Sequence, residues 1–299
     1  MEPLVYVALL NWERPDDTAE CVESVMRSHY LNHRIVVVDN GSRDGSVQRL
    51  RRQFPEVRVL ETGANLGFAA GMNVAITFAM EHGADDVLIL NNDATVDPHL
   101  LGQLVEVTRA RPKLGIVGPT VLFYDDRERV WYGGGRRHWY WPAIVSLPAK
   151  PPECGVDTVI PVDVVSGCGM LVTRAVFEAV GLLDTRFFMY YEDSDFCLRA
   201  KENGYDIGYV PLARMWHKVS ASTSDDVASR TYLRARSKAI FYKRYARGLA
   251  AVTAWAFIIS SAVWTAFRYV WSGQRSFLKP YLSGFTDGLL TDRQRWYND

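Results

Sequence analysis

The chain has 299 residues, of which 34 are basic and 34 acidic, so its formal net charge is zero. With 48% hydrophobic and 23% charged residues, the composition is that of a globular protein and excludes a disordered chain, a collagen or a coiled coil. Residues 225–299 hold twelve Lys and Arg against five Asp, a net charge of +7, which leaves −7 on residues 1–224. A basic excess confined to the tail argues against a nucleic-acid-binding protein.

Strand-like and helix-like patterns alternate through the first 110 residues. Apolar runs predict strands at 5–10, 34–39, 57–60 and 86–90. Helical spacing of apolar residues predicts helices at 16–28, 47–54, 67–82 and 98–109. This alternation indicates a parallel sheet covered on both faces, in which ligands bind beyond the carboxyl ends of the strands.

The second half is patterned differently. Gly118 to Pro161 is rich in Gly, Pro, Trp and Tyr and includes WYGGGRRHWYWP, so we expect a long functional or mobile loop there. Further strands are predicted at 162–173 and 205–210, with a helix between them that ends near Gly204.

The tail begins with a basic helix predicted at 227–247. Residues 249–267 follow without a charge and are long enough to cross a bilayer. Spanning, lying in the interface and packing as a buried helix are all open to such a segment. Because basic residues flank both of its ends, no charge asymmetry orients a crossing, and we expect an interfacial anchor on an anionic membrane.

The four cysteines show neither a CxxC pair nor zinc-ligand spacing, and the N-terminus lacks the basic and long apolar segments of a signal peptide. We therefore expect reduced thiols that face the cytosol. The cysteines are Cys21, Cys154, Cys168 and Cys197.

Two polar clusters follow the first two strands. Asn11 and Trp12 end the first, and the second runs into a turn from Asp39 to Asp44 and Gly45. A carboxylate there can accept the imide N–H of uracil or thymine, and a Trp face can stack on the base. The alternative is ordinary turn chemistry, with Asp44 capping a helix.

A third cluster, from Asn65 to Asn73, opens a helix. Its small residues let backbone N–H groups approach an anion at the helix N-terminus. Alternatively, Gly67 and Gly71 serve only to pack the helix on the sheet.

Asn91, Asn92 and Asp93 follow the fourth strand. A single carboxylate at a strand end suits one hard cation that also holds phosphate oxygens. The alternative is a turn, with Asp97 capping the next helix.

Three carboxylates crowd into four residues at Glu192, Asp193 and Asp195. Crowding raises one pKa and makes a candidate general base, whereas the alternative is a helix cap in which Asp195 pairs with Arg199. His217 follows a strand-like stretch, and a lone His is more often structural than a metal ligand.

The order of these clusters resembles family 2 of the inverting glycosyltransferases, most closely the bacterial rhamnosyltransferase-type branch of cell-wall and surface-polysaccharide synthesis. The resemblance runs from about residue 4 to 224 and rests on VVVDNGSRDGS, NLGFAAGMN, ILNNDATVDP, MYYEDSDFCLRAKENGY and WHKVSAST. It implies a GT-A fold with a nucleotide-binding half (1–118) and an acceptor half (119–224), followed by the helical tail (225–299).

The resemblance also implies roles for single residues. Asp193 corresponds to the catalytic base, Asp93 to the metal-binding last acid of the DxD motif, and His217 to a further metal ligand. Asn91 departs from the motif by replacing its first acid, although we still expect Mg²⁺ or Mn²⁺. Residues assigned to the nucleotide are Asn11, Trp12, Asp39, Asp44, Asn65, Gly67, Asn73 and Asn92.

The implied reaction is an inverting displacement that moves a sugar such as rhamnose from a dTDP- or UDP-linked donor to a lipid-linked saccharide, at the cytoplasmic face of the cell membrane. The run WYGGGRRHWYWP fits an acceptor-side loop as well as a core segment. Two alternatives remain: a sugar nucleotidyltransferase, disfavoured because no early Gly-rich basic loop occurs, and a non-catalytic membrane scaffold, disfavoured by the intact Asp39, Asp93 and Asp193.

Overall fold

The computed structural model describes residues 2–137, 144–147, 158–219, 227–246 and 250–290. Its first half alternates strands and helices as predicted. The strands are β1 (Val5–Asn11), β2 (His33–Asp39), β3 (Arg58–Glu61) and β4 (Asp86–Asn91). The helices are α1 (Pro15–Met26), α2 (Ser46–Gln53), α3 (Gly67–Glu81) and α4 (Leu100–Ala110).

Further strands extend the same sheet, one of them before α4 and the rest after it. They are β5 (Ala94–Val96), β6 (Leu114–Phe123), β7 (Val130–Tyr132), β10 (Ile160–Val162), β11 (Gly169–Thr173) and β12 (Asp206–His217). Two helices, α5 (Arg174–Val180) and α6 (Glu192–Glu202), lie between the last two of these strands. A small hairpin of β8 (Gly135–Arg137) and β9 (Ile144–Ser146) pairs separately.

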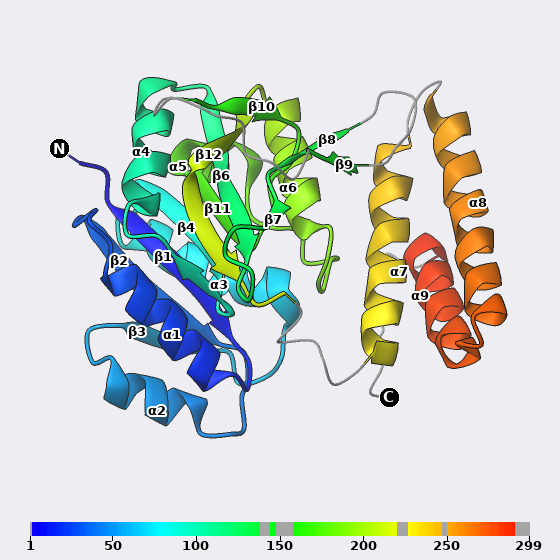
Figure 1. Ribbon diagram of the computed structural model, residues 1–299, viewed down its shortest axis with the longest axis horizontal. Coiled ribbons are helices and arrows are strands. Elements are labelled where there is room, and N and C mark those ends of the chain that lie inside the picture. Colours follow the sequence, from blue (N-terminus) through cyan, green and yellow to red (C-terminus); the bar gives the residue numbers. More distant parts are fainter. Residues whose placement is uncertain (1, 138–143, 148–157, 220–226, 247–249, 291–299) are drawn as a thin grey trace.

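The described strands form a ten-stranded sheet whose main order is β10-β12-β6-β11-β4-β1-β2-β3 (Figure 1). Strands β1 to β4 pair in parallel, as expected for the first half. However, β11 runs antiparallel between β4 and β6, and β10 runs antiparallel to β12. The sheet is therefore mixed, and each of its antiparallel pairs includes β5, β7, β10 or β11.

Two predicted segments need correction. The stretch 162–173 is not one strand, because the chain leaves the sheet after β10 and turns at Gly167 before β11 begins. Nor is 118–161 a single loop, because β6 continues through Gly118 to Phe123 and β7, β8 and β9 follow. A Cβ at Gly118 would lie 2.7 Å from Val165 Cβ, so glycine permits a close approach there instead of ending the strand.

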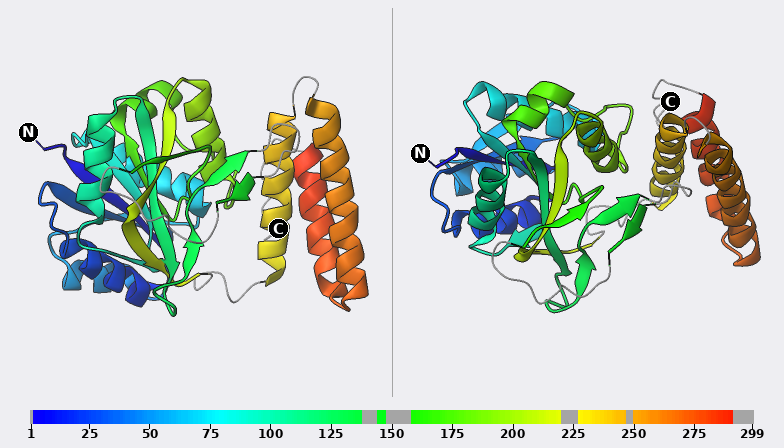
Figure 2. Two further views of the ribbon diagram at one scale, coloured as in Figure 1. Left: turned by 45° about the horizontal axis from the view of Figure 1, so that its top comes forward. Right: turned by 90° about the horizontal axis from the view of Figure 1, so that it is seen from above.

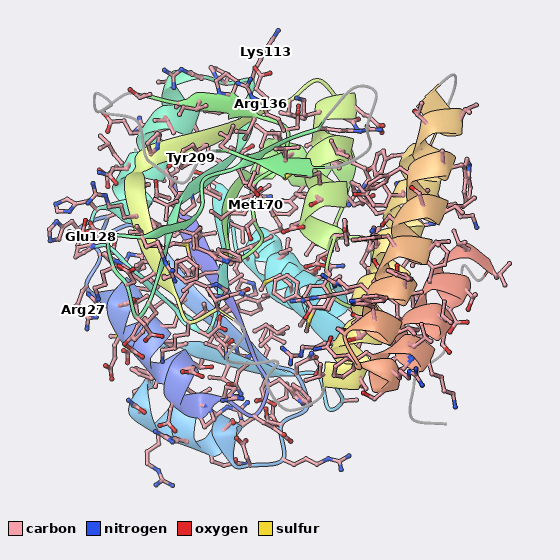
Figure 3. All side chains as sticks on the ribbon, turned by 45° about the vertical axis from the view of Figure 1, so that its right-hand side comes forward. Arg27, Lys113, Glu128, Arg136, Met170 and Tyr209 are labelled. Atoms are coloured by element: carbon pink, nitrogen blue, oxygen red, sulfur yellow. The ribbon has the colours of Figure 1, made fainter. Side chains whose placement is uncertain are left out.

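Alternate residues of the central strands face two hydrophobic layers. From β1, Val7 packs with α1, α2 and α4 on one face, and Ala8 packs with α3, α5 and α6 on the other. Figure 3 shows Met170 and Tyr209 inside the sheet region, whereas Arg27 and Lys113 lie at the periphery. The prediction of a sheet covered by helices on both faces is thus confirmed.

Three helices complete the described chain: α7 (Val227–Tyr245), α8 (Ala250–Trp271) and α9 (Leu278–Leu290), the last preceded by a 3-10 turn, η2 (Arg275–Phe277). Figures 1 and 2 show them as a layer beside the sheet, with α7 innermost. α7 packs closely on α9, since a Cβ at Gly284 would lie 2.2 Å from the carbonyl oxygen of Tyr232.

The hydrophobic core does not stop at residue 225. Ile240, Phe241, Tyr242 and Tyr245 of α7 belong to the same buried cluster as the face of the sheet that carries α3 and α6. α7 is therefore packed as part of the α/β body, and α8 reaches the same cluster through the buried Ile258.

Candidate active site

The carboxyl ends of β1, β2 and β4 meet at one edge of the sheet. The register pairs Asn11 with Asp39 and Leu10 with Asn91, so the polar residues that follow these strands come together. This is the edge at which open α/β sheets bind ligands.

Asn11 and Asp39 form the centre of a buried polar network. The Asn11 amide donates to Asp39 Oδ2 at 2.7 Å, and the Ser42 N–H donates to Asp39 Oδ1 at 2.9 Å. On its other side, Asn11 accepts from the Thr18 hydroxyl at 2.7 Å, and that hydroxyl accepts from Asn92 at 2.9 Å. The network fixes the Asp39 carboxylate, whose remaining lone pairs can still accept an imide N–H.

Trp12 and Asp44 are the exposed members of the predicted nucleoside set. Trp12 is 45% exposed beside the network, which leaves its ring face open for stacking. Asp44 accepts hydrogen bonds from the N–H and the hydroxyl of Ser46 at the start of α2. This is the turn chemistry that the sequence offered as the alternative for Asp44.

Asn65 and Gly67 are held by Asn40, which the sequence reasoning missed. The Asn40 amide donates to Asn65 Oδ1 at 3.0 Å and to the Gly67 carbonyl at 3.2 Å, and its oxygen accepts the Leu66 N–H at 3.1 Å. Gly67 has φ +80°, and a Cβ there would lie 2.3 Å from the Phe188 ring. Asn40 stands inside the quoted DNGS run, so its place in that turn was the available signal.

Asn73 lies one turn and a half further along α3 and faces another partner. Its amide donates to the Leu183 carbonyl at 2.9 Å and its oxygen accepts the Leu183 N–H at 3.1 Å. It thereby ties α3 to the segment that leads to α6. Gly71 packs against the sheet as the alternative held, since a Cβ there would lie 2.7 Å from Leu10 Cδ1.

Asp93 and His217 are brought together although they lie 124 residues apart in the chain. Both are buried, and Asp93 Oδ1 lies 3.0 Å from His217 Nε2. The amide of Asn91 lies 3.3 Å from the same His nitrogen, and the Trp131 ring packs on the imidazole with centroids 5.1 Å apart. The sequence pattern fits both a core position and an acceptor-side loop for Trp131, and the structure packs it against the core beside His217.

The strand end that carries His217 is tied down by Lys218. Its N–H donates to the Asp93 carbonyl at 2.9 Å, and its ammonium lies 2.6 Å from Asp17 and 2.7 Å from Glu20 on α1. Burial alone would lower the pKa of Lys218, but its hydrogen bonds to Asp17 and Glu20 raise that pKa above the usual value. Lys218 therefore stays charged and holds β12 against α1.

The Asp93–His217 pair fits a divalent cation. Asp93 Oδ1 is buried, and apart from its contact with His217 Nε2 it has no hydrogen-bond partner among the described residues. Neighbouring ligands of one octahedral Mg²⁺, each about 2.1 Å from the ion, lie about 3.0 Å apart, which is the separation between Asp93 Oδ1 and His217 Nε2. The described residues contain no group of three or more His, Cys, Asp or Glu that could hold an ion, so further ligands would have to be phosphate oxygens and water.

Asp193 occupies the first turn of α6, beside this edge. Its Oδ2 accepts the Gly167 N–H at 2.9 Å, and its Oδ1 accepts the Ser194 N–H at 2.6 Å. Burial raises the pKa of Asp193, although these N–H donors partly offset the rise. Sequence reasoning missed Gly167, whose only signal was its place in VSGCGM.

Glu192 and Asp195 flank Asp193 in different states. Burial, followed by the neighbouring Asp193 carboxylate, raises the pKa of Glu192 well above its usual value. Asp195 pairs with Arg199 at 2.8 Å, as predicted from their i,i+4 spacing. The three crowded carboxylates thus divide into a partly exposed one, a buried acid and a structural ion pair.

The polar residues that follow β1, β2 and β4, the Asp93–His217 pair and the Asp193 carboxylate thus lie near the carboxyl edge of a mixed α/β sheet. Residues 3–238 match the model of the family described as glycosyltransferase like family 2, and the chain belongs to that family. This membership favours a glycosyltransferase over the nucleotidyltransferase and scaffold alternatives.

Two relatives and one solved structure indicate the branch and the fold. The chain is 32% identical over 225 residues to the N-acetylglucosaminyl-diphospho-decaprenol L-rhamnosyltransferase of Mycobacterium tuberculosis, covering 69% of this chain and 73% of that one. It is 25% identical over 188 residues to the dTDP-rhamnosyl transferase RfbF of Shigella flexneri, covering 62% and 60%. A mannosyltransferase of Pyrobaculum calidifontis, solved with GDP-Man and Mn²⁺, aligns with a TM-score of 0.59 and 16% identity over 97% of this chain and 88% of that chain. The GT-A fold and the rhamnosyltransferase-like branch are confirmed.

Proposed function

We propose that this glycosyltransferase is inverting, uses a divalent cation, and transfers a rhamnosyl group from a dTDP- or UDP-linked donor to a lipid-linked saccharide. The observation that carries the proposal is the Asp193 carboxylate, which is partly exposed, raised in pKa and fixed by the Gly167 N–H. The names of the two bacterial relatives support rhamnose as the sugar, and one of them supports a polyprenyl-diphosphate acceptor.

Asp193 accepts the proton of the acceptor hydroxyl as that oxygen attacks the anomeric carbon. The bond from this carbon to the diphosphate oxygen breaks on the opposite face, and its electron pair leaves with the diphosphate. A raised pKa makes Asp193 a stronger base once it is ionised, and its two backbone donors keep it oriented.

Asp93 and His217 would hold Mg²⁺ or Mn²⁺, which when bound supplies positive charge to the leaving diphosphate. Asp39 accepts from the base of the nucleoside, and Trp12 stacks on it. Asn11, Asn92 and Asn65 hold this pocket in shape, while Gly67 and Asn73 set the start and the packing of α3 beside it.

Asp193→Asn tests the assignment of the base. The change keeps the size and one oxygen acceptor but removes the basic carboxylate, so sugar transfer should be abolished while calorimetry still shows nucleotide binding. Asp206→Asn, at the exposed start of β12, is the matched control and should transfer normally. Transfer that survives in Asp193→Asn would show that another group is the base.

The donor is tested separately. Hydrolysis rates for dTDP-rhamnose, UDP-sugars and GDP-mannose should be highest for dTDP-rhamnose. A clear preference for GDP-mannose would refute the choice of donor and leave the base assignment untouched.

We also propose that α8 anchors the protein in the plane of an anionic membrane. α8 is long and apolar enough to cross a bilayer by length and composition. However, Ala254, Ile258 and Ala262 bury one side of it, and Ser261 binds the ammonium of Lys238 on α7. A crossing helix would have to leave α7 or draw this charged contact into the hydrocarbon.

The outer side of α8 is apolar and suits the interface. Trp264 is 64% exposed and Trp271 is 82% exposed, and both rings stack on Phe267. The exposed cations Arg268, Arg275 and Lys279 lie at the same end and fit anionic headgroups. Cys21, Cys168 and Cys197 are free and buried, and Cys154 lies outside the described residues; the free thiols support placing this membrane surface on the cytoplasmic side.

Vesicle sedimentation tests the anchor. Trp264→Glu should weaken binding to phosphatidylglycerol-containing vesicles at least tenfold, and alkaline carbonate should extract the wild-type protein from membranes. Leu31→Glu is the control, because Leu31 is 84% exposed in the turn before β2. If Trp264→Glu instead changes the oligomeric state and leaves vesicle binding intact, the face is a contact between copies.

A further inference from the structure

The turn that leads into the proposed base is strained. Tyr190 and Tyr191 immediately precede α6 and have φ +72° and +70°. This left-handed region is unfavourable for an aromatic residue and persists only where surrounding contacts impose it. The same segment reaches the nucleotide side, because the Phe68 N–H donates to the Phe188 carbonyl at 2.6 Å.

The contacts that impose this turn come from α7. The Ser237 hydroxyl donates to the Met189 carbonyl at 2.8 Å, and the Tyr191 ring packs on Phe241 with centroids 5.1 Å apart. The Arg234 guanidinium lies 4.8 Å from the centre of the Tyr190 ring. α7 therefore contacts both strained residues, and it also binds the carbonyl of Met189 directly before them.

The end of α7 also reaches the first turn of α6. Asp195 is fully buried, and its Oδ1 lies 2.9 Å from the Tyr245 hydroxyl and 3.0 Å from Arg244 Nη1. Tyr245 also donates to the Asp195 carbonyl at 3.2 Å. Because Asp193 and Asp195 share one helical turn, the contacts that fix Asp195 also fix the direction in which Asp193 points.

We propose that α7 positions the catalytic base, with Tyr245 as the principal positioning residue and Arg244 and Ser237 in support. The inference rests on the proposed function, in which Asp193 is the base. None of these three residues has to touch substrate; they act through Asp195 and Met189. The catalytic unit therefore extends to Tyr245 at the end of α7.

Tyr245→Phe is the direct test. It removes the hydroxyl that binds Asp195 but keeps the ring, which packs on Phe241 with centroids 4.9 Å apart. With a misdirected base, kcat should fall roughly tenfold or more, while nucleotide affinity and donor KM stay unchanged, because the Asp39 and Asp93 side of the pocket is untouched.

Tyr232→Phe is the matched control. It lies on the same helix, and its hydroxyl donates to Asp287 on α9 at 2.7 Å, away from α6. It should keep the wild-type kcat. In an Asp195→Ala background, Tyr245→Phe should lower kcat by less than it does in the wild type, because the carboxylate acceptor is gone and only the backbone carbonyl of residue 195 remains.

Three results would overturn the inference: an unchanged kcat in Tyr245→Phe, an equal loss in Tyr232→Phe, or a parallel fall in nucleotide affinity, which a merely structural role would give. Asp193→Asn is measured alongside. If it keeps transfer, the base assignment fails; if it is inactive and Tyr245→Phe is normal, only the role of α7 fails. Arg244→Gln provides the same comparison if Tyr245→Phe does not fold.

Discussion

The two sides of the proposed active site are built in contrasting ways. On the proposed nucleotide side, Asn11, Asp39 and Ser42 form hydrogen bonds with one another within turns that directly follow their strands. On the base side, Asp193 and Glu192 have raised pKa values, and the turn before them is strained. The first side is held by local hydrogen bonds, and the second by a helix some fifty residues further along the chain. Different substitutions should therefore impair nucleotide binding and the base.

The largest effect is expected on the nucleotide side, from Asp93→Ala. The change removes the carboxylate proposed to hold the cation, and the charge on the leaving diphosphate is then neutralised less well. We expect a roughly thousandfold loss of transfer, about 4 kcal/mol, with loss of the Mn²⁺-dependent part of nucleotide binding in calorimetry.

Asp97→Ala is the control for this loss, since Asp97 accepts the His99 N–H at 2.9 Å in the turn before α4. The predicted helix cap at Asp97 is wrong, because α4 begins at Leu100 and its N-cap residue, His99, has no side-chain cap. It should retain metal-dependent binding. Equal nucleotide binding by wild type and Asp93→Ala, with and without Mn²⁺, would remove Asp93 from the metal site.

Gly41→Ala should destabilise the turn after β2 on the same side of the site. Gly41 has φ +81°, and a Cβ there would lie 2.6 Å from the backbone of Ala64. Gly45 has φ +82° with nothing within 4 Å, so Gly45→Ala measures the cost of the backbone conformation alone. We expect about 1 kcal/mol of lost stability for Gly45→Ala and roughly 2–3 kcal/mol for Gly41→Ala, measured by urea unfolding.

Equal losses of stability in the two glycine variants would mean that the turn around Gly41 shifts to accommodate the added methyl group. In that case the nucleotide side would be less rigid than its hydrogen bonds indicate, and the contrast with the base side would weaken.

The contrast also explains how far sequence reasoning reached. Asp39 and Asp93 were found because polar residues directly after apolar strands are a local pattern, and the parallel register then brings them together. The Gly167–Asp193 hydrogen bond joins residues 26 apart, and Tyr245 meets Asp195 across 50 residues, so no local pattern marks either contact. His217 reaches Asp93 through the pairing of β12 with β5, a short strand that was not predicted.

Strand bounds failed where proline and glycine suggested a break. The strand predicted at 205–210 stops at Pro211, but β12 runs on to His217 because a register shift between Val210 and Arg214 absorbs the irregularity. This extension of β12 carries His217 to the site. Because the predicted strand ends at residue 210, the sequence pattern does not place His217 beside Asp93.

The smallest effect is expected on the base side, from Glu192→Gln. Burial and the Asp193 carboxylate raise the pKa of Glu192 well above its usual value, so the neutral acid is favoured and Gln resembles it. We expect kcat at pH 7 within about twofold of wild type, with the acid limb of the pH profile still set by Asp193, whose transfer activity is lost as pH falls through its raised pKa.

Stability then distinguishes a neutral Glu192 from a charged one. An acid whose pKa is raised by folding binds more protons folded than unfolded, so wild-type stability falls as pH rises above the pKa of the unfolded chain. Glu192→Gln lacks this loss of stability. Its melting temperature should therefore exceed that of wild type by more at pH 8 than at pH 5. Glu202→Gln, at the exposed end of α6, is the control and should show no such difference. A large fall in kcat at unchanged stability would instead mean that Glu192 acts as a charged partner of Asp193, and the base side would then work with two carboxylates.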